Sequence, residues 1–122
     1  MFISTLKALS LFCERASGHK VIAVDTEFLR ERTYHPKLCL IQVATKDEAA
    51  AIDPLAIGDL SPLLALLEDE SITKVFHACD QDLEVIYDSC GCVVAPVFDT
   101  QLAAAFLGHR MQMGLGDRKS VV

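Results

Sequence analysis

The sequence has little positive charge and no apolar run as long as a membrane-spanning helix. Of its 122 residues, 17 are acidic and 11 are basic, which gives a net charge of −6. A membrane span needs about 20 mostly apolar residues in a row, so we expect none here. Proteins that bind phosphate backbones by simple electrostatic attraction are usually basic, which argues against that class. An acidic protein can still act on nucleic acids if its carboxylates hold cations that meet the phosphates.

Several segments that define other protein classes are also missing. The N-terminus has no basic flank followed by an apolar stretch and a cleavage site, so we expect no signal peptide. No linker rich in Pro, Gly or Ser divides the chain, and its 52% hydrophobic composition is typical of one folded domain. There is no Gly-rich phosphate loop of the G-x-x-x-x-G-K-S/T or G-x-G-x-x-G type. The five cysteines are odd in number and form only one C-x-C, which indicates reduced thiols of a cytoplasmic protein.

Apolar runs and helix signals alternate along the chain. Short β-rich runs at residues 21–24, 38–44 and 49–53 predict three strands that follow one another without a helix between them. Further strands are expected at 74–77 and 93–98, and helices at 4–17, 61–69, 80–90 and 99–107. The pattern predicts an α/β fold: a mixed sheet whose first three strands form an antiparallel portion, with flanking helices.

The stretch Val24-Asp25-Thr26-Glu27-Phe28 is the most informative one. Side chains alternate across a strand, so Asp25 and Glu27 point the same way at the end of a very hydrophobic strand. Neighbouring carboxylates repel each other, and a divalent cation relieves that repulsion. Hard oxygen ligands favour Mg²⁺ or Mn²⁺. D-x-E is a common pattern, however, and two solvated acids just past a strand are the alternative interpretation.

A third carboxylate follows in the segment Phe76-His77-Ala78-Cys79-Asp80-Gln81-Asp82-Leu83, where a strand runs into a helix. Acids are common in the first turn of a helix because they cap it and complement its dipole. The helical wheel indicates that Asp80 is the cap and that Asp82 faces the protein. Two acids on a central strand and one from a helix start can form a two-metal site for phosphodiester hydrolysis. Taken alone, His77 and Asp99 are more typical of structural roles.

Three separated segments together resemble a known family. They are VIAVDTEFLRERTYHPKLCLIQVA, VFHACDQDLEVI and PVFDTQLAAAFLG, in that order. They resemble the ribonuclease D family of the DEDD superfamily of 3′→5′ exonucleases, over about residues 2–116. The resemblance implies a ribonuclease-H-like fold and release of nucleoside 5′-monophosphates from RNA 3′ ends, tRNA precursors in particular.

The same resemblance implies roles for individual residues. Asp25, Glu27 and Asp82 are expected to be catalytic and to hold two divalent ions, Mg²⁺ or Mn²⁺. The residues expected to border the 3′-terminal nucleotide are Thr26, Phe28, His77 and Gln81.

The sequence departs from the family in its last part. The family has a third motif, Tyr-x-x-x-Asp, which supplies a fourth carboxylate and a tyrosine, and no such spacing occurs in this chain. We interpret residues 1–116 as a partial 3′→5′ exonuclease domain. The last six residues, DRKSVV, can be encoded by a sequencing-adapter read, so we interpret 117–122 as a non-native tail.

Two other functions compete with the exonuclease hypothesis. Three carboxylates without the fourth are also compatible with a non-catalytic nucleic-acid-binding or structural remnant of such a domain. An aspartyl-phosphate phosphatase with Asp25 as nucleophile is disfavoured, because such enzymes usually have an aspartate at +2 and a threonine or valine at +4. Those positions are Glu27 and Leu29 here.

Overall fold

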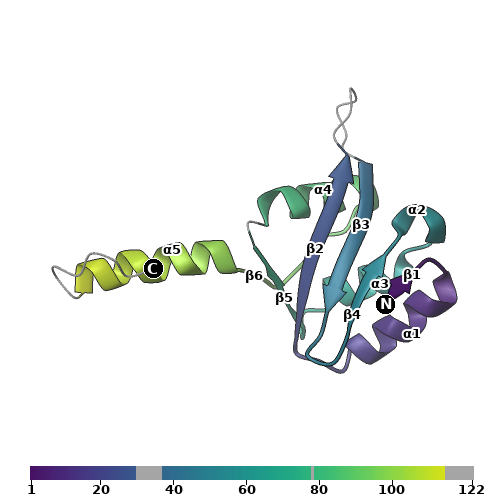
Figure 1. Ribbon diagram of the computed structural model, residues 1–122, viewed down its shortest axis with the longest axis horizontal. Coiled ribbons are helices and arrows are strands. Elements are labelled where there is room, and N and C mark those ends of the chain that lie inside the picture. The colour runs from purple at the N-terminus through teal and green to yellow at the C-terminus, as the bar shows by residue number, and fades with distance from the viewer. Residues whose placement is uncertain (30–36, 78, 115–122) are drawn as a thin grey trace.

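The computed structural model describes residues 1–29, 37–77 and 79–114, and within these ranges six strands form one mixed sheet. The strand order is β1-β4-β3-β2-β5-β6 (Figure 1). The strands are β1 (Phe2–Ile3), β2 (Val21–Leu29), β3 (Lys37–Ala44), β4 (Ala49–Ile52), β5 (Thr73–Phe76) and β6 (Val97–Asp99). β3 is antiparallel to both β2 and β4, while β5 is parallel to β2 and to β6. The predicted mixed sheet with its antiparallel three-strand portion is confirmed; the two-residue strand β1 was not predicted.

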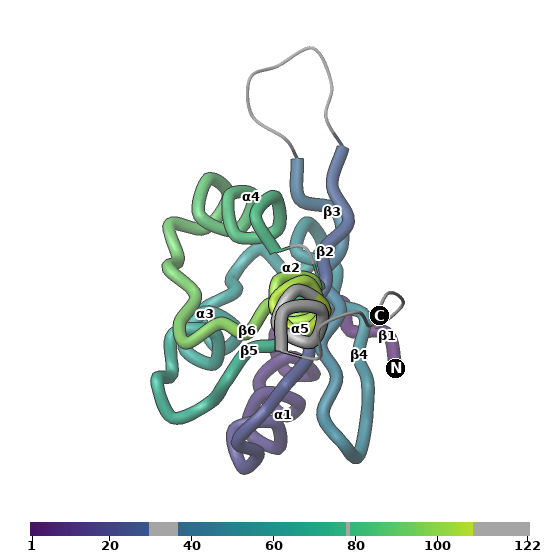
Figure 2. Tube along the Cα trace, turned by 90° about the vertical axis from the view of Figure 1, so that its left-hand side faces the viewer, coloured from purple at the N-terminus to yellow at the C-terminus, as the bar shows by residue number. Residues whose placement is uncertain are grey.

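Helices lie between β1 and β2, between β4 and β5, between β5 and β6, and after β6. They are α1 (Leu6–Ala16), α2 (Pro54–Ile57), α3 (Ser61–Glu68), α4 (Asp80–Cys90) and α5 (Thr100–Gly114). Helices α1, α3 and α4 lie on the same side of the sheet (Figure 2). Helix α5 instead runs away from the sheet, as Figure 1 shows. No helix in the described part of the chain is long and apolar enough to cross a membrane.

The hydrophobic core lies between the sheet and helices α1, α3 and α4. In β2, Ile22 and Val24 point into this core. The residues that alternate with them, Val21, Ala23 and Asp25, are exposed. This alternation is what a strand with one covered face requires. The largest fully buried apolar side chains come from all of these elements: Phe12, Phe76, Ile3, Leu9, Ile22, Ile41, Ile52, Leu63, Leu67, Ile72 and Ile86.

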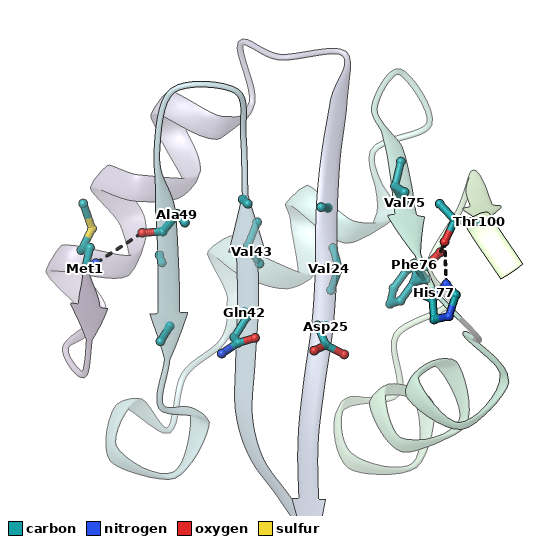
Figure 3. A pocket seen from close by; sticks show the side chains of 14 residues that line it. Met1, Val24, Asp25, Gln42, Val43, Ala49, Val75, Phe76, His77 and Thr100 are labelled. Carbon is teal, nitrogen blue, oxygen red and sulfur yellow. Dashed lines mark hydrogen bonds between the residues drawn. The ribbon is translucent and has the colours of Figure 1, made fainter.

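The opposite face of the sheet is open and is made largely of small side chains. Ala23 on β2 pairs with Ala44 on β3, which pairs with Ala49 on β4. In the next row, Asp25 pairs with Gln42. The open face therefore presents the carboxylate of Asp25 above a shallow floor of alanines (Figure 3).

The cysteines are all free thiols, as predicted. Cys13, Cys79 and Cys92 are buried, and Cys39 and Cys90 are partly buried. Burial raises the pKa of the Cys13 and Cys92 thiols to about 11. Because the thiolate is the reactive form, these two residues serve as packing groups in the core.

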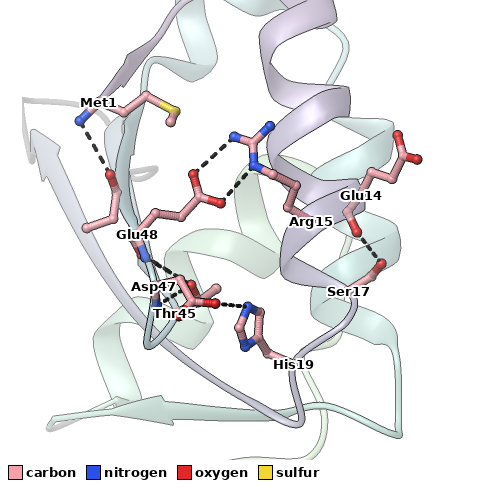
Figure 4. Close-up of polar contacts among 9 residues, drawn as sticks. Met1, Glu14, Arg15, Ser17, His19, Thr45, Asp47 and Glu48 are labelled. Atoms are coloured by element: carbon pink, nitrogen blue, oxygen red, sulfur yellow. Dashed lines mark hydrogen bonds and ion pairs between the residues drawn. The ribbon is translucent and has the colours of Figure 1, made fainter.

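An exposed ion pair fastens α1 to the turn between β3 and β4. Arg15 donates from Nε to Glu48 Oε2 at 2.8 Å and from Nη2 to Glu48 Oε1 at 3.0 Å (Figure 4). The hydrogen bonds from Arg15 hold the pKa of the Glu48 carboxyl below its usual value. Within the turn, Thr45 Oγ1 accepts from the backbone N–H groups of Asp47 and Glu48. The chain thus uses one of its few arginines to fix the edge of the open face.

A buried lysine links the end of α3 to the segment that precedes β6. Lys74 is 0% exposed, and its Nζ donates to the carbonyl oxygens of Asp69 and, at 2.8 Å, of Ala95. Burial lowers the pKa of this ammonium group, because removal from water disfavours its charged form. The two carbonyl contacts offset part of that cost.

Replacing Lys74 by alanine is expected to lower the free energy of unfolding by about 3 kcal/mol, because it removes two hydrogen bonds and leaves a cavity. Urea unfolding followed by circular dichroism measures this change. The matched control is Lys20→Ala at an exposed lysine, which is expected to change stability by less than about 0.5 kcal/mol. Equal effects of the two substitutions would contradict the structural role of Lys74.

Candidate active site

The central strand β2 divides its polar residues between the two faces of the sheet. Asp25 and Glu27 are exposed on the open face, whereas Thr26 between them is only 6% exposed and faces the helices. The ladder between β2 and β3 shifts register between Glu27 and Phe28, directly after the two carboxylates. The expected common orientation of Asp25 and Glu27 follows from this alternation.

Helix α4 brings the third predicted carboxylate against β2 from the covered side. Asp82 lies in the first turn of α4, is 7% exposed, and accepts a hydrogen bond from the Thr26 hydroxyl. The prediction that Asp82 faces the protein is confirmed. The prediction that Asp80 caps this helix is wrong: Cys79 is the N-cap, and Asp80 is the first helical residue.

The helix that carries Asp82 is held in place by Asp99. The Asp99 carboxylate accepts from the backbone N–H of Cys79 at 3.0 Å and from that of Gln101 at 2.9 Å. One side chain therefore caps α5, as the sequence indicated, and also fixes the beginning of α4. This connection sets where Asp82 meets Thr26.

The three carboxylates are near enough to influence one another. Burial is the main cause that raises the pKa of Asp82, and the charges of Asp25 and Glu27 raise it further. The hydrogen bond from Thr26 acts in the opposite direction, because it stabilises the ionised form. Three negative charges in one neighbourhood provide the oxygen donors that Mg²⁺ and Mn²⁺ prefer.

The carboxylate oxygens are suitable ligands for a divalent cation, but the three side chains lie farther apart than the ligands of a bound ion. Among the described residues, no group of three or more His, Cys, Asp or Glu side chains is arranged so that it could hold a metal ion. Asp82 is engaged with Thr26 on the covered side, while Asp25 and Glu27 point to the open side.

A cavity of about 750 Å³ lies on the open face beside Asp25. It is lined by Met1, Ala23, Val24, Asp25, Gln42, Val43, Ala44, Ala49, Ala50, Ala51, Val75, Phe76, His77 and Thr100. Figure 3 shows Asp25 on β2 and His77 just after the neighbouring strand β5, with Thr100 next to the imidazole ring. Such a space is large enough for a nucleotide-sized ligand.

Of the four residues expected to border a nucleotide, only His77 lines this cavity. Thr26 is buried on the opposite face against Asp82, and Phe28 packs against the core. Gln81 borders a smaller hollow together with Asp80 and Gln101. The structure therefore separates these four residues, which the sequence had grouped by their nearness to the motifs.

Two polar residues in the cavity were not singled out from the sequence. Gln42 is paired with Asp25 across the β2–β3 ladder, and Thr100 contacts His77. Gln42 could have been found as the polar position that interrupts the apolar run of β3. Thr100 follows an expected capping residue, and nothing in its sequence context indicates a contact with a residue 23 positions earlier.

The mixed sheet with its antiparallel three-strand portion and flanking helices is a ribonuclease-H-like fold. Residues 1–117 match the family model described as 3′-5′ exonuclease. The chain belongs to this 3′-5′ exonuclease family.

Relatives of this chain carry the name Ribonuclease D. The chain is 56% identical over 117 residues to Ribonuclease D of Sphingobium indicum, covering 94% of this chain and 30% of that protein. The crystal structure of Escherichia coli RNase D superimposes with a TM-score of 0.86 at 48% identity, covering 92% of this chain and 30% of that one. The Trypanosoma brucei RNase D complex with RNA shares the fold, with a TM-score of 0.75 at 22% identity. The chain spans about 30% of the length of the two bacterial relatives.

Proposed function

We propose that this chain is the catalytic portion of a metal-dependent 3′→5′ exoribonuclease. It would hydrolyse the terminal phosphodiester bond of RNA and release nucleoside 5′-monophosphates. The observation that carries the proposal is that Asp82 from α4 lies near enough to Asp25 and Glu27 on central strand β2 for their charges to raise its pKa, while Asp25 lines a nucleotide-sized cavity. That the chain belongs to the 3′-5′ exonuclease family supports the same reaction.

Asp25, Glu27 and Asp82 would hold two divalent ions, Mg²⁺ or Mn²⁺. Such ions, when bound, lower the pKa of water and stabilise the leaving oxygen of a phosphodiester. The carboxylates themselves repel a phosphate, so the site needs cations before it can accept RNA. Thr26 holds Asp82 in position through its hydroxyl group.

The ligand cavity beside Asp25 would receive the 3′-terminal nucleotide. His77 lines it from the end of β5, and Gln42 lines it from β3. The alanine floor leaves room for a ribose and base between these side chains. Phe28 and Gln81 remain proposed substrate contacts, reached from the end of β2 and the beginning of α4.

The substrate class is proposed from the relatives. Proteins named Ribonuclease D share up to 56% of their aligned residues with this chain. We therefore propose RNA 3′ ends as the substrate, with tRNA precursors as the specific transcripts. Five free cysteines suit a reducing compartment, and we propose the cytoplasm as the site of action.

The chain contains no Tyr-x-x-x-Asp motif, so it lacks the fourth carboxylate and the tyrosine that this motif supplies. An activity assay of the 122 residues alone is therefore not a sufficient test. A chimera solves this: the segment of E. coli Ribonuclease D that aligns with this chain is replaced by the chain's own residues. The chimera is incubated with 5′-labelled single-stranded RNA and Mg²⁺ or Mn²⁺. We expect a ladder of 3′-shortened products that disappears when a chelator is added.

The competing function is a non-catalytic remnant, and the open spacing of the three carboxylates favours it as a second candidate. In that case the chimera folds and binds RNA, but it releases no nucleotide with either metal. A folded chimera without metal-dependent shortening would therefore overturn the exonuclease proposal.

A further inference from the structure

A threonine outside the predicted site controls the imidazole ring of His77. The Thr100 hydroxyl group donates to the carbonyl oxygen of Phe76 at 3.2 Å. The same oxygen, Thr100 Oγ1, lies 2.9 Å from His77 Nδ1 (Figure 3). Thr100 begins α5, Phe76 ends β5 and His77 follows it directly, so this contact joins the beginning of α5 to the end of β5 beside the cavity.

The single proton of the Thr100 hydroxyl group bears on the tautomer of His77. A hydroxyl group has one proton and two lone pairs. When the Thr100 hydroxyl group donates to Phe76, it can only accept from the ring, and the hydrogen of a neutral His77 then lies on Nδ1. In that tautomer the other nitrogen, Nε2, is an acceptor.

We propose that Thr100 is a positioning residue that keeps His77 in the Nδ1–H tautomer, so that Nε2 accepts a hydrogen bond from a ribose hydroxyl of the terminal nucleotide. The ligand part of this inference rests on the proposed function. The tautomer part stands on the hydrogen bonds alone.

The chemistry of the cavity selects the donor. A phosphodiester offers only acceptor oxygens, which a neutral Nε2 and the nearby Asp25 carboxylate cannot satisfy. Ribose hydroxyl groups are donors that occur in every nucleotide, so contacts to them do not depend on sequence. The bases carry the other donors in RNA, and these differ between adenine, which has an amino group, and uracil, which has an imino N–H. His77 and Asp25 therefore form a pair of acceptors suited to a sugar.

The tautomer is tested on the 122-residue chain by ¹⁵N NMR at alkaline pH, where imidazole rings are neutral. His77→Phe assigns the ring resonances by their disappearance. We expect the protonated nitrogen to be Nδ1 in the native chain and in Thr100→Ser, which retains the hydroxyl group. In Thr100→Val we expect a shift toward the Nε2–H tautomer, which is the usual preference of a free ring.

Thr73→Val is the matched control, because Thr73 begins β5, the strand that directly precedes His77, and its substitution leaves the hydroxyl group of Thr100 intact. We expect it to leave the ring resonances unchanged. An Nε2–H tautomer in the native chain, or an unchanged ring in Thr100→Val, would overturn the positioning role.

The ligand part is tested by calorimetric binding of adenosine 5′-monophosphate with Mn²⁺ to the native chain, Thr100→Val and His77→Phe. We expect about three- to tenfold weaker binding in both variants, the effect of one hydrogen bond. The 2′-deoxy and 3′-deoxy analogues identify which ribose hydroxyl group donates to His77. The analogue that lacks this hydroxyl group should bind the native chain and His77→Phe with equal affinity. Uridine 5′-monophosphate should show the same losses as the adenosine nucleotide.

Three results would overturn the ligand part. The first is that the native chain binds no nucleotide. The second is that His77→Phe weakens the binding of both deoxy analogues, and the third is that it weakens the binding of only one of the two bases. The chimera assay of RNA shortening is independent of all three. If the chimera is active but His77→Phe does not change nucleotide affinity, this inference alone is rejected. If the folded chimera is inactive, the proposed function is rejected.

Discussion

Asp25→Asn in the chimera is expected to slow the shortening of RNA by about three orders of magnitude, a typical loss when a reacting-centre group is removed. Asparagine has nearly the same shape as aspartate, but it has no charge and one oxygen fewer. Asp25 is exposed on the open face and lines the cavity, so the substitution removes no core contact. Its cost should therefore appear in turnover and not in folding.

The control for this prediction is Asp88→Asn, at an exposed acid in the last part of α4. It changes the net charge by the same amount, and we expect normal rates. Circular dichroism of both variants should match the parent chimera. Normal turnover of Asp25→Asn would refute its assignment as a metal ligand, and an equal loss in Asp88→Asn would show that total charge, and not the site, sets the rate.

The regular alternation of buried and exposed side chains along strands and helices explains why much of the fold could be predicted. In β2 the apolar residues Ile22 and Val24 are buried, and the alternation continues through Thr26 to separate it from Asp25. The helical spacing of α4 likewise placed Asp82 toward the protein. Both results depend only on local geometry, which a sequence records directly. The shortest element, β1, has too few residues to show any period.

Contacts between distant segments could not be predicted in this way. The hydrogen bonds from Thr26 to Asp82 and from Thr100 to Phe76 join residues 56 and 24 positions apart. Each depends on how α4 and α5 are placed against the sheet. The resemblance grouped Thr26 with the substrate contacts, and the alternation of the strand turns its side chain to the covered face, against Asp82. A substrate contact of Thr26 therefore stays a prediction.

The closeness of the carboxylates also explains a conflict between function and stability. Asp82 is buried, and it has two acidic neighbours whose charges raise its pKa. A structure selected only for stability would not retain this arrangement, since a neutral residue avoids both costs. Function commonly maintains such groups at the expense of folding free energy. Substitution of Asp82 should separate the two requirements.

Asp82→Asn in the 122-residue chain is expected to raise the free energy of unfolding by about 1 kcal/mol at pH 7.5 with chelator present. The gain is modest because solvent near Asp25 and Glu27 screens their charges. Asparagine retains an oxygen that accepts from Thr26, so the buried hydrogen bond persists. Urea unfolding measures the difference, and lower stability of the variant would contradict the account of repulsion.

The pH dependence of this gain has a definite sign. The pKa of Asp82 is raised in the folded chain, so the folded state holds the proton more tightly than the unfolded state. The cost of the charged aspartate is complete above the raised pKa and disappears as the pH falls toward the ordinary value of about 4. The stability advantage of Asp82→Asn should therefore shrink to nothing near pH 4.

Divalent ions should reverse the order of stability at pH 7.5. Mn²⁺ that binds only the folded state stabilises the native chain with the logarithm of its concentration above the dissociation constant, and Asp82→Asn should lose most of this response. Asp80→Asn is the matched control in the same helical turn, and it should keep the response without the gain in chelator. An ion response in Asp82→Asn equal to that of the native chain would exclude Asp82 as a ligand, because a carboxylate that binds the ion cannot be neutralised without cost.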